Sequence, residues 1–264
     1  MDDADFAQLV NRALGPSTPR VWSLLVTMFG DLALAPDARL SGATVNAITA
    51  KIGIKPEATR VALHRLRKED WIESHRTGRQ TRYGLTPHGR SQTRAAWPRV
   101  YGPALEGLQA VLVVEDPSSP ADWPTDHASA ATVQIGPKTF VTTGTDVQKG
   151  HLCLPLEQDA PLPDWVRDKL CPPEVQTSSV DLAQRLSGVL ADDRLTGLSL
   201  LQRSALRIVI VHDWRRLILR TPAFPEDLLA PRWKGAECRD AIRALTTLLP
   251  VPDLKQLDAD IDAG

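Results

Sequence analysis

The chain has 264 residues and a formal net charge of −1, with 42% hydrophobic and 24% charged residues. This length predicts roughly two domains, or three small ones, and the composition excludes a largely disordered or fibrous protein. No apolar run approaches the ~20 residues that span a bilayer, and the acidic opening MDDADF does not resemble a signal peptide. We therefore expect a cytoplasmic protein with no membrane partner.

The cysteines are three in number and lie far apart, at Cys153, Cys171 and Cys238. None has a CxxC or HxxxH spacing, so the sequence indicates neither a disulfide framework nor a zinc site. We expect reduced structural thiols and no cofactor.

Charge is distributed unevenly along the chain. The window from Lys51 to Arg99 contains twelve Lys or Arg and four acids, a net charge of +8, which leaves −9 for the rest of the chain. A basic block of this kind indicates a candidate surface for nucleic acid.

A first helix is predicted after Pro19, and the preceding residues 1–19 are expected to form a loose N-terminal extension. Apolar residues recur at helical spacing after Arg20, which is typical of a core helix with a wide apolar face. They are Val21, Trp22, Leu25, Met28, Phe29 and Leu32.

Two helices joined by a tight turn are predicted next. Ser41 begins the first helix, and Gly53 falls where a left-handed helix stop is wanted. Pro56 opens the second helix, which extends to about Asp70. The second helix has an apolar side (Ala58, Ala62, Leu63 and Leu66) and a basic side (Arg60, His64 and Arg67).

A β-hairpin and a further helix follow. Residues 71–74 and 81–85 have strand-like types and flank a segment in which Gly78 suits a hairpin tip. Arginines near this tip make the hairpin a candidate wing. Thr86 and Pro87 then have the pattern of a helix cap, and we expect that helix to reach Trp97, because a proline follows it.

The remainder of the chain divides into two kinds of segment. Short apolar runs among many prolines, between residues 100 and 173, predict a small domain of short strands. Helical periodicity returns from Asp181, is broken by prolines between 222 and 231, and ends at Pro250.

Two blocks of residues resemble one known family. The first comprises Phe29-Gly30-Asp31, RVALHRL at 60–66, Trp71, Gly78-Arg79 and Tyr83-Gly84-Leu85-Thr86, and the second comprises Asp213-Trp214-Arg215-Arg216, Pro222, Phe224-Pro225, Leu228-Leu229, Pro231, Trp233 and Gly235. In order and spacing they resemble the phenylacetic acid degradation repressor (PaaX) family of bacterial transcriptional regulators. Two blocks at opposite ends are more specific than one helix-turn-helix alone.

The resemblance implies an α+β fold with three domains after the N-terminal extension. These are a winged helix-turn-helix at 20–98, a small central ferredoxin-like α/β domain at 99–175 and a helical domain at 176–264. It also implies a homodimeric repressor of an aromatic-acid catabolic operon, bound to a double-stranded DNA operator and released by an acyl-coenzyme A thioester such as phenylacetyl-coenzyme A. Thr221 in place of the usual Asp, and the proline-broken segment 117–131, depart from the family pattern.

The candidate DNA contacts lie on the second predicted helix and on the wing. Arg60, His64 and Arg67 form a row that could meet base edges in the major groove, and the alternative is a solvated basic face. Arg65 lies about 100° around the helix from that row, so its alternative role is an ion pair within the domain. The wing arginines suit phosphate or minor-groove contacts. The full candidate set is Lys55, Glu57, Thr59, Arg60, His64, Arg65, Arg67, Arg76 and Arg79.

A second candidate site is the cluster Trp214, Arg215 and Arg216. Arginine suits phosphate geometrically, so the cluster could hold an anionic effector. We favour the alternative, in which Trp214 belongs to the core and the arginines pair with acids such as Asp213 or Asp227.

Two other classes of function compete with a regulator. Asp116, at the end of an apolar run, could be a magnesium ligand of a nuclease in the central domain, but a metal site needs several oxygen donors. No GxSxG, P-loop or GxGxxG motif supports another enzyme class. A winged helix that docks protein is the other alternative, and the +8 window favours DNA over it. We expect no enzymatic activity.

Overall fold

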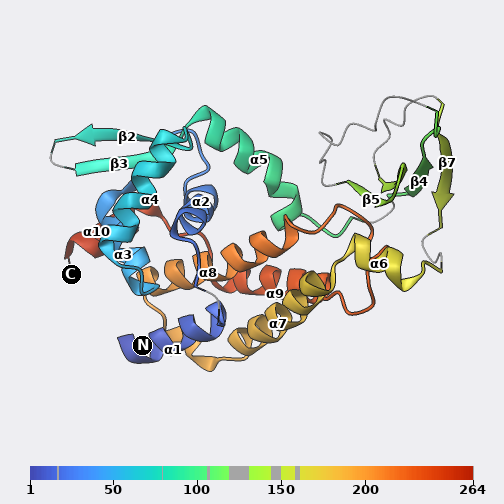
Figure 1. The fold of residues 1–264 in the computed structure, drawn as a ribbon. Coiled ribbons are helices and arrows are strands. Elements are labelled where there is room, and N and C mark those ends of the chain that lie inside the picture. The colour runs from blue at the N-terminus through green and yellow to red at the C-terminus, as the bar shows by residue number, and fades with distance from the viewer. Residues whose placement is uncertain are drawn as a thin grey trace. The chain divides into compact units, whose positions relative to one another are not determined.

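The computed structural model shows an α+β protein (Figure 1). It describes residues 1–16, 18–78, 80–105, 108–118, 131–143, 150–157 and 161–263. The chain divides into two compact units. The first comprises Met1–Tyr101, Gln184–Arg215 and Asp240–Gly264, and the second comprises Gly102–Ala183 and Arg216–Arg239.

The N-terminal part of the first unit alternates helices with short strands. Its elements are α1 (Asp3–Leu14), α2 (Val21–Leu32), β1 (Leu40–Ser41), α3 (Gly42–Lys51), α4 (Pro56–Lys68), β2 (Ile72–Thr77), β3 (Gln80–Leu85) and α5 (Pro87–Tyr101). The expectation of a loose start is wrong, because α1 is a capped amphipathic helix. Asp2 accepts a hydrogen bond from the Asp5 amide at 2.8 Å, and Phe6, Leu9 and Val10 are buried.

The predicted pair of helices and its tight turn are confirmed as α3 and α4. The Ser41 hydroxyl caps α3 by accepting from the Thr44 amide at 3.0 Å. Gly53 has φ 83°, a left-handed conformation that glycine adopts without strain. The amides of Gly53 and Ile54 then return to carbonyls of the last turn of α3, which ends the helix and turns the chain into α4.

The predicted hairpin is confirmed as β2 and β3, which β1 extends to a sheet of order β1-β3-β2. The antiparallel register runs from Ile72 opposite Leu85 to Thr77 opposite Gln80. Gly78, at φ 60°, lies at the tip, where a two-residue turn requires positive φ. Arg79 lies outside the described residues.

Helix α5 is longer than the sequence predicts. The hydroxyl of Thr86 accepts from the Gly89 amide at 3.0 Å, so the predicted cap is confirmed. The helix continues through Pro98 to Tyr101, because a proline removes one amide from the ladder without forcing every helix to end. A Cβ at Gly89 would lie 2.2 Å from the carbonyl oxygen of Trp71, so only glycine allows this approach.

The core of this segment is built from α2, α3, α4 and the sheet. Helix α2 contacts α4, and α3 contacts α4. Buried apolar side chains from these elements fill the space between them: Leu24, Leu25, Met28, Phe29, Leu40, Val45, Ile48, Leu66, Ile72 and Leu85. Burying a side chain of this kind contributes about 1.5–3 kcal/mol.

The predicted C-terminal helices are confirmed, and one more is present. They are α7 (Pro173–Leu190), a 3₁₀ turn at Asp193–Gly197, α8 (Leu200–Ile218) and α9 (Gly235–Leu248). A further helix, α10 (Leu254–Ala263), follows Pro250 and contacts α3.

The second unit contains an antiparallel sheet of order β5-β6-β4-β7. Its strands are β4 (Ala110–Val114), β5 (Thr132–Gly136), β6 (Thr139–Thr142) and β7 (Leu152–Leu156), and α6 (Asp164–Leu170) follows them. The predicted short strands are therefore confirmed. Most of the proline-broken segment, residues 119–130, lies outside the described residues.

In the part of the chain described here, no helix has the length and apolar character of a membrane span.

Candidate nucleic-acid interface

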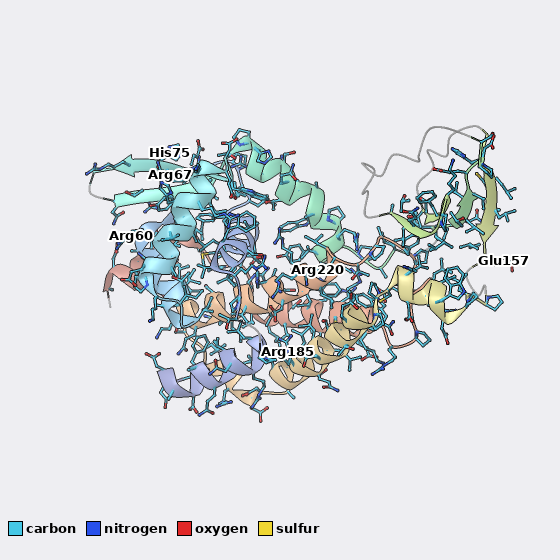
Figure 2. All side chains as sticks on the ribbon, viewed as in Figure 1. Arg60, Arg67, His75, Glu157, Arg185 and Arg220 are labelled. Carbon is cyan, nitrogen blue, oxygen red and sulfur yellow. The ribbon has the colours of Figure 1, made fainter. Side chains whose placement is uncertain are left out.

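Helix α4 divides its residues cleanly between core and solvent. Ala62, Leu63 and Leu66 are buried, so the opposite face is free of the rest of the unit. Figure 2 shows Arg60 and Arg67 along this helix. The exposed residues of α4 are Pro56, Glu57, Arg60, Val61, His64, Arg65, Arg67 and Lys68. The predicted row of Arg60, His64 and Arg67 thus lies together on one solvent-facing surface, and Lys55 is exposed just before it.

Two of the acids near this face are engaged in ion pairs, whereas Glu57 is exposed in the first turn of α4. Glu69 pairs with Arg65 at 2.7 Å, and Glu73 pairs with Arg39 at 3.3 Å and His75 at 3.2 Å. Among the described residues no ion pair neutralises Arg60 or Arg67.

Thr59 does not belong to this face, which corrects its place among the predicted contacts. Its side chain is 0% exposed, and its hydroxyl donates to the Thr49 hydroxyl at 3.0 Å. The Thr49 hydroxyl donates in turn to the Val45 carbonyl at 2.9 Å. Thr59 therefore fixes α4 against α3 and sets the direction in which the exposed face points.

Arg65 makes the ion pair that was the alternative to DNA contact. Besides its pairing with Glu69, its guanidinium lies 5.2 Å from the ring centroid of Trp22 in α2. Such a cation–π contact contributes roughly 0.5–1 kcal/mol at an exposed site. Arg65 thus connects α4 to α2.

The hairpin places basic side chains on the wing. Arg76 is exposed on β2, and its Nε donates only weakly, at 3.4 Å, to the Gly78 carbonyl. His75 lies on the same strand (Figure 2). Arg82, on β3, pairs with Asp258 of α10 at 2.8 Å. The wing and α4 therefore present basic groups from neighbouring elements of one unit.

Sequence reasoning overlooked Val61 on α4. Its side chain is 68% exposed, although valine is usually buried. An exposed valine directly after Arg60 on this helix suits contact with a thymine methyl group in the major groove. The sequence feature that could have identified Val61 is its position directly after Arg60.

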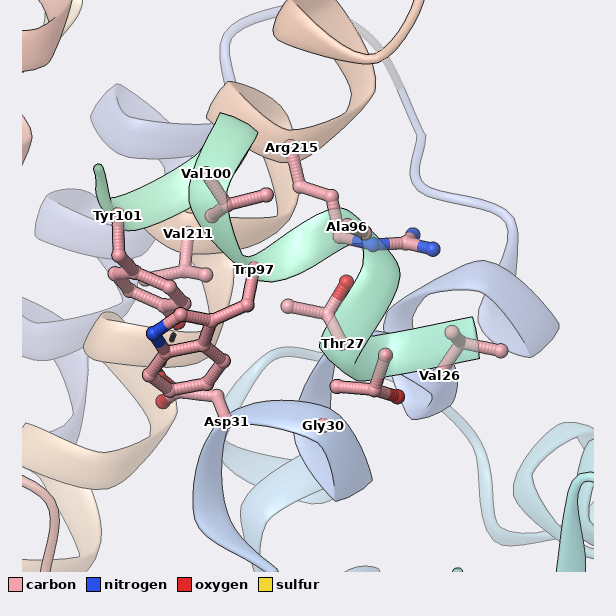
Figure 3. A pocket seen from close by; sticks show the side chains of 11 residues that line it. Val26, Thr27, Gly30, Asp31, Ala96, Trp97, Val100, Tyr101, Val211 and Arg215 are labelled. Carbon is pink, nitrogen blue, oxygen red and sulfur yellow. Dashed lines mark hydrogen bonds between the residues drawn. The ribbon is translucent and has the colours of Figure 1, made fainter. Parts of the chain in front are cut away.

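A cavity lies between α2, α5 and α8 of the same unit (Figure 3). Its enclosed volume is about 30 Å³, which is room for about one water molecule. The rings of Trp97 and Tyr101, whose centroids are 4.2 Å apart, line it together with Arg215. Burial lowers the pKa of Arg215, and no acid among the described residues forms an ion pair with it. This guanidinium is a charge that an anion could neutralise.

The other two members of the predicted effector cluster are placed differently. Trp214 is 0% exposed and its indole donates to the Val100 carbonyl at 2.8 Å, so the core alternative is confirmed. Asp213 accepts from Arg185 at 2.9 Å, so its expected pairing with the adjacent arginines is wrong. Arg216 is half-buried.

Asp116 lies in an ordinary turn after β4. Its carboxylate accepts from the amide and hydroxyl of Ser118 at 2.8 and 2.7 Å, which hold its pKa below the usual value. In the described ranges no three His, Cys, Asp or Glu side chains are grouped to bind a metal ion. The carboxylate thus stabilises a loop.

Comparison with known proteins places the sequence in a family. A model of the PaaX-like protein matches residues 20–89, and a model of the PaaX-like protein C-terminal domain matches residues 190–252. Together these matches cover half of the chain. The chain belongs to the PaaX-like family.

A curated relative agrees with this assignment, and a solved structure shares the fold. The transcriptional repressor PaaX of Escherichia coli is 26% identical over 245 residues, which is 82% of this chain and 76% of the relative. The solved structure of the uncharacterized protein Rv0674 from Mycobacterium tuberculosis has a TM-score of 0.51 at 19% identity. That match covers 90% of this chain and 97% of the other. At that identity the similarity shows the fold alone.

Proposed function

We propose that this PaaX-like protein is a transcriptional repressor that binds duplex DNA through residues 20–98. The order of elements from α2 to β3, helix, strand, two helices and a hairpin, is that of a winged helix-turn-helix. The observation that carries the proposal is the exposed face of α4, where Arg60 and Arg67 form no ion pair in the described chain. In this arrangement α4 is the recognition helix and the β2–β3 hairpin is the wing.

Individual side chains then have different tasks. Arg60 and His64 read base edges in the major groove, and Val61 contacts a thymine methyl group. Lys55, Arg67 and Arg76, together with Arg79 on sequence grounds, contact phosphates and set the register on the duplex. Glu57, exposed in the first turn of α4, can accept from a cytosine amino group.

The DNA-binding form is a homodimer, because one recognition helix covers one half-site and such proteins commonly bind two. The half-sites would be about 34 Å apart, or a multiple of that distance. Light scattering of the protein, free and with DNA, tests this, and a strict monomer under both conditions would contradict it.

The regulated genes and the effector follow from family resemblance. We propose an aromatic-acid catabolic operon in the bacterial cytoplasm, relieved by an acyl-coenzyme A thioester such as phenylacetyl-coenzyme A. The guanidinium of Arg215, which lines the same cavity as Trp97 and Tyr101 and forms no ion pair in the described chain, supports an anionic ligand. Arg216 remains a candidate contact, whereas the buried Trp214 does not.

The domain boundaries at 20–98, 99–175 and 176–264 also remain our proposal. The sheet order β7-β4-β6-β5 supports a ferredoxin-like central domain. If the four strands are numbered 1 to 4 along the chain, this order is 4-1-3-2, which is that of the ferredoxin-like fold.

The decisive experiment is sequencing of DNA fragments that the purified protein selects from a random pool, with and without candidate thioesters. We expect enrichment of an inverted repeat that the effective thioester weakens. Enrichment of no sequence would contradict the repressor function.

A further inference from the structure

Asp258, on α10, is held by two groups of the proposed DNA-binding segment. One carboxylate oxygen accepts from Arg82 of β3 at 2.8 Å, and the other accepts from the hydroxyl of Thr44, in the first turn of α3. Asp258 is 13% exposed and Arg82 is 35% exposed, so the pair lies near the surface. All three residues belong to the first unit.

The surroundings of this carboxylate are those of an anion site. The first turn of α3 carries the positive end of the helix dipole. Register in the sheet places Arg82 opposite Ser41, the cap of that helix, on one side and opposite His75 of β2 on the other. A guanidinium, a hydroxyl and a helix N-terminus together are what proteins use to hold a DNA phosphate. An oxyanion, the Asp258 carboxylate, already fills the place.

The site is continuous with the proposed DNA-binding surface. His75 and Arg76 continue along β2 from the strand position opposite Arg82. A duplex that meets α4 and the wing would bring a phosphate near Arg82 and the N-terminus of α3, where it would meet the carboxylate of Asp258.

Helix α10 is anchored to the unit but carries further negative charge. Leu257 is 0% exposed, which fixes the helix beside α3. Asp260 and Asp262 are exposed on the same helix. Among the described aspartates of α10, Asp258 is the one that contacts Thr44 of α3 and Arg82 of β3, so its effect on DNA should differ from that of Asp260 and Asp262.

We propose that Arg82 is a phosphate contact for duplex DNA, and that Asp258, held in place by the buried hydroxyl of Thr44 (1% exposed), neutralises it in the free protein. The C-terminal helix thereby lowers DNA affinity from within the chain. The inference rests on the proposed function, because it requires that α4 and the wing bind DNA.

The test compares Asp258→Asn with Asp260→Asn and Asp262→Asn. An asparagine can still accept from Thr44, so the fold should persist, and each variant removes one negative charge from α10. At about 50 mM salt we expect Asp258→Asn to bind duplex DNA roughly fivefold to tenfold more tightly, with a salt slope steeper by about 0.9. The two controls should change affinity less than twofold and leave the slope unchanged.

A second variant separates competition from a structural role. Arg82→Gln alone should bind DNA more weakly than the wild type, because it leaves the negative charge of Asp258 uncompensated, whereas Arg82→Gln combined with Asp258→Asn should return to the wild-type affinity and lose the gain. If Asp258 instead holds Arg82 in position for DNA, Asp258→Asn will bind more weakly, and the inference is overturned. Equal gains from all three aspartate variants would also overturn it.

The two proposals fail in distinguishable ways. If the wild type binds no DNA, or binds it independently of Arg60, the DNA-binding function itself is wrong. If binding depends on Arg60 but Asp258→Asn matches the wild type in affinity and salt slope, only the Asp258 inference is wrong.

Discussion

Arg207 of α8 holds the carboxylate of Asp31 of α2 with two hydrogen bonds, at 2.6 Å from Nε and 2.8 Å from a terminal nitrogen. Both side chains are almost completely buried, and the Tyr101 hydroxyl donates to the same carboxylate. Arg207 also donates to the carbonyls of Thr246 and Leu249. One buried ion pair thus joins the second helix, the end of α5 and the C-terminal helices of the first unit.

Removing one member of this pair should be costly. We expect Asp31→Asn to lower the free energy of unfolding by about 3–5 kcal/mol, because it leaves a buried guanidinium without its counter-charge. Urea denaturation measures the change. The exposed pair Asp240 and Arg243, at 3.4 Å, provides the control: Asp240→Asn should cost less than about 1 kcal/mol. A similar small cost for both would show that Asp31 is not the anchor.

The recognition helix and the wing should respond differently to alanine. Arg60→Ala should cost about 1–3 kcal/mol on the selected operator and narrow its advantage over random duplex. Arg76→Ala should weaken both kinds of DNA similarly and reduce the salt slope by about 0.9. Fluorescence anisotropy at several salt concentrations measures both, with thermal melting as the control for folding. Unchanged operator preference in Arg60→Ala would show that the reading face is misplaced.

Thr59 should matter for the fold and not for DNA chemistry. Thr59→Val keeps the shape and removes the hydrogen bond to Thr49, so we expect a loss of roughly 0.5–1.5 kcal/mol in unfolding free energy. Operator affinity of the folded fraction should stay within about twofold, in contrast to Arg60→Ala. A large loss of affinity with unchanged stability would return Thr59 to the DNA contacts.

Alkaline pH should destabilise the protein through Cys171. Burial raises the pKa of this thiol to about 11 from an ordinary value near 9. The unfolded chain therefore loses the proton first, so the stability contribution is complete below about pH 9 and declines as pH rises toward 11. Each pKa unit of separation corresponds to about 1.4 kcal/mol. Urea denaturation under reducing conditions at pH 8, 9 and 10 should show a shallower decline for Cys171→Ala than for the wild type, and parallel declines would contradict the assignment.

Local signals in the sequence predicted much of the DNA-binding segment. Ser41, Gly53 and Gly78 act within a few residues of their own positions, so a cap, a helix stop and a hairpin tip could be predicted from residue type alone. The basic row on α4 followed from periodicity. Contacts between residues that are far apart in the sequence could not be predicted from such local patterns.

Thr59 and α10 illustrate that limit. A threonine at the edge of a helical face can meet water or another hydroxyl, and only the packing of α4 on α3 selects Thr49 as its partner. Helix α10 carries Leu254, Leu257 and Ile261 at helical spacing, but the sequence does not say that this helix packs against α3, which lies far earlier in the chain. In both cases the partner is chosen by the tertiary fold. The cavity beside Arg215 is likewise formed by three helices that are far apart in sequence.

The aromatic cluster at the base of the proposed wing makes tryptophan fluorescence a reporter of DNA binding. Trp22 and Trp71 meet edge to face at 6.0 Å, His88 lies 5.9 Å from Trp71, and the Arg65 guanidinium covers Trp22. The indole of Trp22 therefore senses a cation carried by α4, and a neighbouring imidazole lies beside Trp71. A rotation of α4 as it enters a groove would shift the charge over Trp22 and change its emission. A change in tryptophan emission on adding DNA that is lost in Trp22→Phe would then report DNA binding without a dye.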